Sequence, residues 1–241
     1  MAKARGRSAM LSKALSEGLS LKAAEVIWRS MIVPVLNYGS ELWGAAKCNE
    51  VEKVQLEVGK RLLGVSKKMA SVVVRGELGW WSMRAQRDMK RLMYWARLIR
   101  MDDSRLVKSV YRIRREKAGK RISDWCTEVH RTLTSIALGH IWDTEEVGSE
   151  NDWKSLIKAS IHAREEKEWI TEMRKLPKLR TYQQLKFVLE REEYLETISD
   201  SEQRRRVTAL RGGTNSLRIE VGRWKGESLQ DRTCTLCAKR E

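Results

Sequence analysis

Proline and tight-turn sequences are scarce in this chain of 241 residues. The two prolines are Pro34 and Pro177, and the Asn-Gly and Asp-Gly pairs that are typical of β-hairpins do not occur. Few positions therefore force the backbone out of a helix. This scarcity predicts a mainly α-helical protein.

Long apolar segments are missing as well. No run of about 18 apolar residues could cross a bilayer, and the N-terminus lacks the apolar core and cleavage site of a secretory signal. Of four cysteines, Cys48 and Cys126 stand far apart and only Cys234 and Cys237 are close, which is not typical of a disulfide framework. We therefore expect an intracellular protein, nuclear or cytoplasmic, with no membrane partner.

Catalytic signatures are also lacking. The sequence contains no G-x-S-x-G, no H-E-x-x-H and no glycine-rich phosphate loop with its lysine. Asp102 and Asp103 resemble a metal-binding pair only superficially, because they follow a basic amphipathic helix and lack a strand-turn-strand setting. We therefore predict no catalytic residue, no enzyme activity of the chain itself and no small-molecule substrate.

Positive charge is what the sequence has in excess. It holds 48 Lys and Arg residues against 32 Asp and Glu, which gives a formal charge of +16. Such an imbalance destabilises a compact protein by self-repulsion unless a polyanion is the usual partner. Nucleic acid is the first candidate for that partner; an anionic membrane surface is the second by charge alone, and we do not predict it as a partner.

The charge is concentrated in two stretches. Residues 84–121 contain fourteen basic and four acidic residues, and residues 204–225 contain seven basic residues and one acid. Residues 140–172, in contrast, contain nine acids and four bases, so we interpret them as a connector or a protein-facing element. Cations on one rigid face release counterions from a phosphate backbone and bind it without reading its sequence.

A helical wheel over the first basic stretch separates an apolar arc from a basic one. Residues 85, 89, 92, 93, 96 and 99 form the apolar arc, which suits a core. The predicted phosphate contacts on the basic arc are Arg84, Arg87, Lys90, Arg91 and Arg97. A second predicted patch comprises Arg204, Arg205, Arg206, Arg211 and Arg223. The alternative interpretation of both sets is a solvated helix surface, which is what most charge runs are.

Apolar periodicity and capping residues predict seven helices. They begin near Ser20, Val51, Met83, Ser123, Trp153, Thr181 and Ser199, and the first is bent or stopped at Pro34. Only "SVVVRGEL" and "SLRIEVGRW" have the pattern of short strands. Trp80, Trp81 and Trp224 could stack on bases, although burial is the expectation for each.

Several stretches, in their order, resemble the C-terminal third of reverse transcriptases from non-LTR, LINE-type retrotransposons. They are "VPVLNYGSELWG", "VEKVQLEVGKRLLGVSK", "GELGWWSM", "YWARLIRMDDSRLVK", "LRGGTNSLRIEVGRW" and "RTCTLC". The resemblance covers nearly the whole chain from about Ser8. It implies a helical thumb that grips a template-primer duplex, then a helical connector, then the start of a zinc knuckle.

The resemblance therefore implies three segments: a thumb-like basic helical domain over residues 1–119, a helical connector over 120–200, and a basic segment over 201–241 with a short β/turn element. Cys234 and Cys237 would be the first two zinc ligands, but the later histidine and cysteine of the knuckle are absent. Zinc is expected only if other ligands complete this half-site; otherwise the pair is a free dithiol.

No palm carboxylates precede the resemblance, so we expect a nucleic-acid-binding fragment of a reverse transcriptase that cannot polymerise by itself. Its partners would be RNA, an RNA–DNA hybrid or a DNA backbone. The alternative is a helical protein-interaction module, domesticated or decayed, with no specific nucleic-acid role, in which the acidic middle and the tryptophans contact protein.

Overall fold

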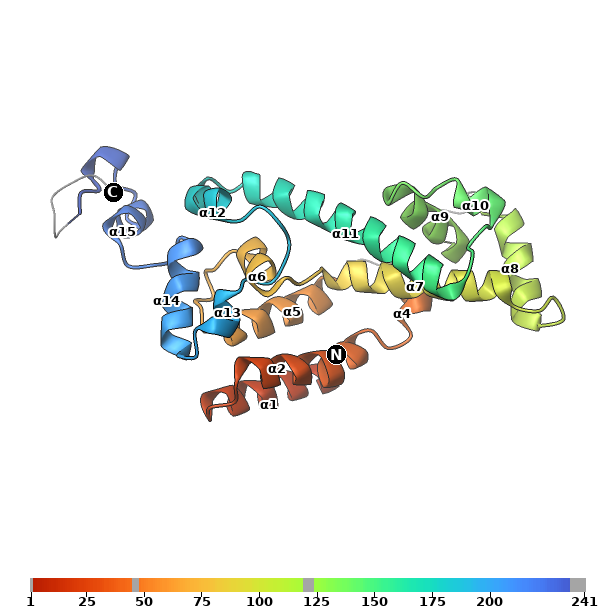
Figure 1. The fold of residues 1–241 in the computed structure, drawn as a ribbon, viewed down its shortest axis with the longest axis horizontal. Coiled ribbons are helices and arrows are strands. Elements are labelled where there is room, and N and C mark those ends of the chain that lie inside the picture. The colour runs from red at the N-terminus through yellow and green to blue at the C-terminus, as the bar shows by residue number, and fades with distance from the viewer. Residues whose placement is uncertain (1, 45–47, 119–123, 235–241) are drawn as a thin grey trace. The chain divides into compact units, whose positions relative to one another are not determined.

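The computed structural model describes residues 2–44, 48–118 and 124–234, and these residues are mainly helical (Figure 1). The first helices are α1 (Ala2–Ser16), α2 (Leu21–Ile27), α3 (Val33–Leu36), α4 (Ser40–Trp43), α5 (Asn49–Leu62), α6 (Ser71–Leu78), α7 (Met83–Arg100) and α8 (Leu106–Glu116). They are followed by α9 (Trp125–Ser135), α10 (Ile141–Thr144), α11 (Glu150–Arg174), α12 (Arg180–Leu185), α13 (Tyr194–Thr197), α14 (Ser201–Arg211) and α15 (Arg218–Trp224). A π-helical turn, η1 (Trp28–Ile32), and two 3-10 turns, η2 (Pro177–Leu179) and η3 (Leu229–Asp231), complete the elements. The predicted mainly α class is confirmed.

Within those described ranges there is no β-sheet; an isolated antiparallel bridge joins Leu78 and Arg191. None of the described helices combines the length and apolar character that crossing a bilayer requires.

Both predicted strands are wrong, because each forms a helix. "SVVVRGEL" is α6, whose Val72, Val73 and Val74 are all buried, so the helix is apolar on nearly every side and periodicity could not identify it. In "SLRIEVGRW" the last seven residues, "RIEVGRW", form α15, and Leu217 is its N-cap, whose amide donates to the Asn215 side chain at 2.8 Å. The expected C-terminal β/turn segment is therefore a helix followed by the turn η3.

The helices predicted from periodicity are largely confirmed. In α5, Val51, Val54, Val58 and Leu62 are buried, and Gly64 follows with φ +65°. Helices α7, α9, α11 and α14 also lie where the apolar pattern placed them. Their caps differ in detail: Asp124 caps α9 and Asp200 caps α14, each one residue beyond the serine that we predicted.

Two helix boundaries differ from expectation. Of the two outcomes expected at Pro34, a bend or a stop, the stop does not occur. The π-helical turn η1 precedes Pro34, and the Val33 amide donates to the carbonyl of Trp28, five residues earlier, so the helix continues into α3. The predicted helix after Thr181 ends early, at Leu185. Lys186 adopts an extended backbone there, and its buried ammonium donates to the Glu190 carbonyl at 2.6 Å and to the Glu192 carboxylate at 2.5 Å.

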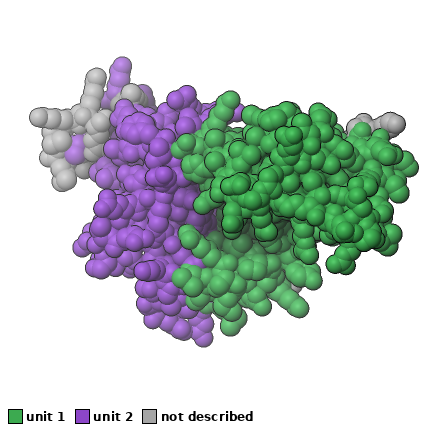
Figure 2. All heavy atoms as spheres, turned by 45° about the vertical axis from the view of Figure 1, so that its right-hand side comes forward, with its two compact units in different colours: residues 1–10, 26–55, 81–168 green, residues 11–25, 56–80, 169–241 purple. Residues whose placement is uncertain are grey.

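The chain divides into two compact units, each built from three separate stretches (Figure 2). Unit 1 comprises residues 1–10, 26–55 and 81–168, and unit 2 comprises residues 11–25, 56–80 and 169–241. The expected boundaries at residues 119/120 and 200/201 separate the thumb-like, connector and C-terminal segments by function, and they stay a prediction.

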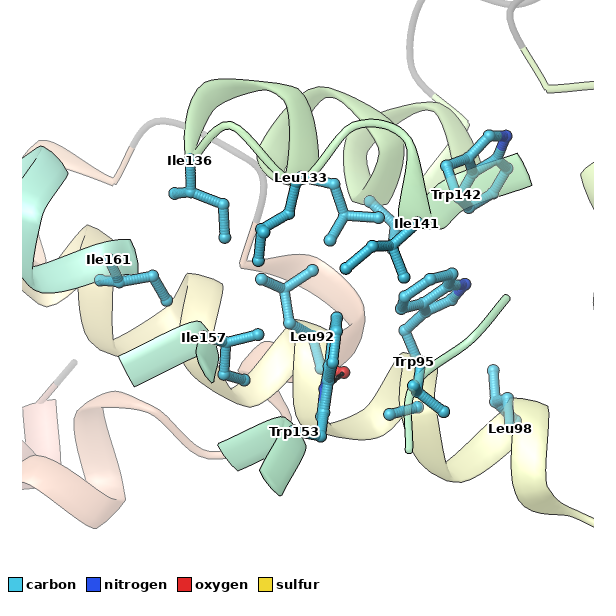
Figure 3. Close-up of a cluster of buried hydrophobic side chains, with 14 of the residues drawn as sticks. Leu92, Trp95, Leu98, Leu133, Ile136, Ile141, Trp142, Trp153, Ile157 and Ile161 are labelled. Carbon is cyan, nitrogen blue, oxygen red and sulfur yellow. Dashed lines mark hydrogen bonds between the residues drawn. The ribbon is translucent and has the colours of Figure 1, made fainter. Parts of the chain in front are cut away.

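The core of unit 1 is built around α7 (Figure 3). Leu92 and Trp95 of α7 face side chains of α9, α10 and α11. Trp95 stacks on Trp142 with ring centroids 5.8 Å apart, and Trp153 donates its indole N–H to the Leu92 carbonyl at 3.1 Å. Each of these three indoles therefore has a polar partner or an aromatic neighbour, and large side chains hold α9, α10 and α11 against α7.

The core of unit 2 is built around α6. Trp169 donates its indole N–H to the Val72 carbonyl at 2.7 Å, and Tyr182 packs edge-on against Trp169 at 6.4 Å. Gly76 permits this approach: a Cβ there would lie 2.3 Å from the Tyr182 hydroxyl. Glu77, with no exposed area, accepts hydrogen bonds from Tyr194 at 2.5 Å and Arg211 at 3.1 Å.

Gly79 provides a test of the unit 2 packing. Its φ is +62°, and a Cβ there would lie 2.4 Å from the Arg191 backbone nitrogen, which cannot move aside as a side chain can. We expect Gly79→Ala to lower the free energy of unfolding by about 3 kcal/mol or more, since the steric clash adds to the roughly 1 kcal/mol of a left-handed alanine. Urea titration followed by circular dichroism measures this. The matched control is Gly226→Ala, because Gly226 also has positive φ (+74°) but nothing within 4 Å of the added Cβ. Equal losses for the two variants would contradict the predicted clash.

Candidate nucleic-acid interface

Helix α7 carries the first predicted cation set, and its N-terminus is held by two oxygen-bearing side chains. The Ser82 hydroxyl accepts from the Ala85 amide at 3.0 Å. The Glu52 carboxylate accepts from the amides of Met83 at 3.0 Å and Arg84 at 2.8 Å. A carboxylate at this position satisfies free N–H groups and is favoured by the helix dipole. The direction of α7 and the rotation of its side chains are therefore well defined.

Two of the five predicted phosphate contacts on α7 are buried. Arg87 is 2% exposed; its guanidinium lies 5.9 Å from the centre of the Trp43 ring and 3.5 Å from Glu52, and it donates to the Gly44 carbonyl at 3.4 Å. Arg91 is also 2% exposed and donates to the Thr132 hydroxyl at 2.8 Å. Neither guanidinium faces solvent, so a phosphate backbone cannot reach either one in this conformation.

Asp88 is the shared counter-charge of this buried cluster. Its carboxylate lies 3.2 Å from Arg91 and accepts a 2.8 Å hydrogen bond from Arg164 of α11, whose other N–H group donates to Ser135 of α9 at 3.0 Å. Burial lowers the pKa of Arg91, and the negative charge of Asp88 partly offsets that effect. We call these residues (Asp88, Arg91 and Arg164) the Asp88 cluster.

The other three predicted α7 cations are exposed. Arg84 lies 3.9 Å from Asp88 with 58% of its side chain exposed. Lys90 donates to the Asn37 carbonyl at 3.0 Å, and Arg97 makes no ion pair with any described residue. Lys90 and Arg97 are seven residues apart, which puts them within about 20° of each other around the helix, so they share one side of α7; Arg84 lies about 120° away from Lys90. We call Lys90 and Arg97 the α7 row.

Two exposed aromatic side chains lie near the turn between α3 and α4: Tyr38 in the turn itself and Trp43 at the end of α4. Tyr38 is 84% exposed and directly follows Asn37, the residue that Lys90 contacts; Trp43 is 40% exposed and donates its indole N–H to the Tyr38 carbonyl at 2.8 Å. Tyr38 is not among the residues predicted to bind nucleic acid. The glycine after it is a turn signal that could have identified Tyr38 as exposed, and this glycine has φ +62°. Of the tryptophans considered for stacking, Trp80 is buried, Trp81 is partly buried and Trp224 is 51% exposed.

The second predicted patch, on α14 and α15, is mostly committed to internal contacts. Arg204 donates to the carbonyls of Ile198 and Ser199, each at 2.7 Å. Arg205 and Arg206 share Glu202, and their hydrogen bonds lower the pKa of that carboxyl to about 2. Only Arg206, 75% exposed, presents most of its side chain to solvent.

Arg211 and Arg223 have structural partners in unit 2. Arg211 lies 3.1 Å from Glu77 and 2.9 Å from Glu192, between the rings of Tyr182 and Tyr194 at 5.8 and 5.7 Å. Burial raises the pKa of Glu77, while the hydrogen bond from Tyr194 and the charge of Arg211 act in the opposite direction. Arg223 donates to the Gly213 carbonyl at 3.0 Å and pairs with Glu220.

The predicted zinc half-site lies at the edge of the described structure. Cys234 is partly buried, and Cys237 lies outside the described residues, so the pair stays a prediction. Among the residues that the structure does describe, no group of three or more His, Cys, Asp or Glu side chains is placed to hold a metal ion.

Comparison with known proteins adds no relative: no protein-family model, no curated protein and no solved structure matches this chain.

The Asp88 cluster gives a stability prediction. Asp88→Asn keeps the size of the side chain but leaves Arg91 and Arg164 without their shared counter-charge, so we expect the free energy of unfolding to fall by roughly 3 kcal/mol. Asp103→Asn is the control, because the Asp103–Arg112 pair is also an Asp–Arg pair but is exposed, and its loss should cost about 0.5 kcal/mol or less. Urea titrations of both variants compare them, and a loss for Asp88→Asn as small as the control's would refute the role of the cluster.

Proposed function

We propose that this chain binds the phosphate backbone of RNA or of an RNA–DNA hybrid, as the thumb-like part of a LINE-type reverse transcriptase does. The observation that carries the proposal is the α7 row, in which exposed Lys90 and Arg97 lie on one side of a helix whose direction is fixed at its N-terminus. Cations held at fixed spacing bind a polyanion together and lose less conformational entropy than cations on a mobile loop.

The surroundings of the row support the same function. Of the twelve basic residues between positions 84 and 117, all of which the structure describes, eight are exposed. The ring of Tyr38, 84% exposed and one residue after the Asn37 carbonyl that Lys90 contacts, supplies a flat apolar surface on which an unpaired base could stack. The binding is electrostatic and independent of sequence, because lysine and arginine contacts to phosphates carry no base information.

Burial changes which residues make the proposed contacts. Arg87 and Arg91 support the fold, and Arg204, Arg211 and Arg223 hold carbonyls and carboxylates of unit 2. The proposed phosphate contacts are therefore Arg84, Lys90 and Arg97 in unit 1 and Arg206 in unit 2.

The proposal is tested with the double variant Lys90→Gln/Arg97→Gln. We expect its affinity for a fluorescein-labelled RNA–DNA hybrid to fall about tenfold or more near 0.1 M salt. We also expect the slope of log K against log salt to become shallower by roughly 1.5, because two phosphate contacts are lost. Fluorescence anisotropy across a salt series measures both quantities.

The matched control is Lys154→Gln/Lys158→Gln. These two lysines are exposed on α11 in the same unit, so the control removes the same charge from an acidic stretch of the chain. Its affinity should stay within about threefold of the unmodified protein. Equal effects of the two double variants would mean that net charge alone acts, and no binding by the unmodified protein at low salt would exclude the proposed function.

A further inference from the structure

Helix α8 presents apolar side chains to solvent. Leu106 is 78% exposed, Ile113 54%, Val107 48% and Val110 45%. At about 100° per residue these four occupy one arc of the helix, and Leu106, Val110 and Ile113 follow the four-then-three spacing of a heptad seam. We call these four residues the α8 stripe.

The opposite side of α8 faces the protein and is polar. Lys108 is buried and donates to the carbonyls of Leu98 at 3.0 Å and Ile99 at 2.5 Å, at the C-terminal end of α7. The buried Tyr111 hydroxyl accepts from the Trp95 indole at 2.9 Å and donates to Glu145 at 2.5 Å. Arg115, one turn further, donates to the Trp142 carbonyl at 2.8 Å and pairs with Glu145 at 3.2 Å.

Helix α8 is thus amphipathic in the reverse sense of an ordinary surface helix, which buries its apolar side and exposes its polar one. The rotation is not loose, because three specific side chains fix it: Lys108, Tyr111 and Arg115 would all lose buried hydrogen bonds if the helix turned its stripe inward. A contiguous apolar stripe that the fold itself holds outward is typical of an interaction surface.

Charge indicates the kind of partner. Between positions 105 and 117, four basic residues (Arg105, Arg112, Arg114 and Lys117) and one acid are exposed, and Arg105 and Lys117 lie just before and just after the helix. Phosphate groups would gain nothing from contact with leucine, valine and isoleucine, so the stripe itself does not suit a nucleic-acid backbone. A partner surface with an apolar seam and acidic flanks would complement both the apolar stripe and the basic residues around it.

We propose that the α8 stripe docks an amphipathic helix of a partner protein that has an apolar seam and acidic flanks. A helix is favoured over a membrane surface because the stripe contains no Trp or Phe, the side chains that usually enter a bilayer interface, and because its β-branched members are stiff knobs that suit a facing helix. This surface differs from the α7 row and does not depend on the proposed nucleic-acid binding.

The probe is a pair of helix-stapled, three-heptad peptides with leucine at both seam positions and either glutamate or lysine at the flanking positions. We expect the glutamate peptide to bind the full chain with a micromolar Kd and the lysine peptide to bind at least tenfold more weakly, both measured by fluorescence anisotropy. Equal binding of the two peptides, or no binding of either, overturns the proposal.

Two variants locate the site. Val110→Gln/Ile113→Gln should weaken binding of the glutamate peptide at least tenfold while circular dichroism stays unchanged, since both side chains are already exposed. Leu156→Gln, an equally apolar position 41% exposed on α11 of the same unit, should leave binding unchanged. Arg105→Glu/Lys117→Glu should reverse the preference in favour of the lysine peptide, an outcome that a merely structural role of these residues would not produce.

The same test distinguishes two other molecules that could cover the α8 stripe, a membrane and a second copy of this chain. Cosedimentation with phosphatidylserine vesicles that Val110→Gln/Ile113→Gln abolishes, without peptide binding, would assign the stripe to a membrane and overturn the proposal. A dimer in light scattering that the same variant dissociates would assign it to a second copy of this chain. Binding of the RNA–DNA hybrid by that variant should remain unchanged, which separates this inference from the proposed function.

Discussion

The carboxylate of Asp88 is the interaction on which the rest of unit 1 depends. It lies on α7, pairs with Arg91 on the same helix and accepts a hydrogen bond from Arg164 on α11. The two arginines in turn bind Thr132 and Ser135 of α9. Three helices are therefore joined by one buried charge cluster beside an apolar core. Because a buried guanidinium without a counter-charge is very unfavourable, the cluster permits only the arrangement in which all its members meet.

This constraint explains why a basic sequence gives a less basic surface. Arginine is suited to burial when a carboxylate balances its charge and carbonyl or hydroxyl groups accept hydrogen bonds from part of its guanidinium. Arg87 and Arg91 in unit 1 and Arg211 in unit 2 are used in this way. Lys90 and Arg97 remain exposed on α7, and neither side chain pairs with a carboxylate among the described residues. Partner availability, and not charge density along the chain, determines which arginines can bind an external anion.

Helices whose buried side carries a clear apolar stripe, such as α5, α7 and α11, could be predicted from the sequence, whereas α1 was not predicted. Helix α6 could not, because burial on nearly all sides removes the periodic signal and leaves three valines with strand propensity. The residues of the binding site were even harder to predict from the sequence than the helices. A helical wheel separates polar from apolar residues but does not show that Glu52 or Arg164, distant in sequence, lies beside the polar arc. Arg87 and Arg91 were assigned to solvent for that reason.

In helix α8, too, the available hydrogen-bond partners determine which side is buried. Its buried side is polar because the C-terminal carbonyls of α7 and the carboxylate of Glu145 need donors, and Lys108 and Arg115 supply them. The aliphatic residues of α8 are then left on the only side that remains. Where buried carbonyls and carboxylates need hydrogen-bond donors, a helix can supply them only by turning its polar side inward. Its apolar side is then exposed and available to another molecule. The packing of α8 and the exposure of its apolar stripe therefore have one physical cause.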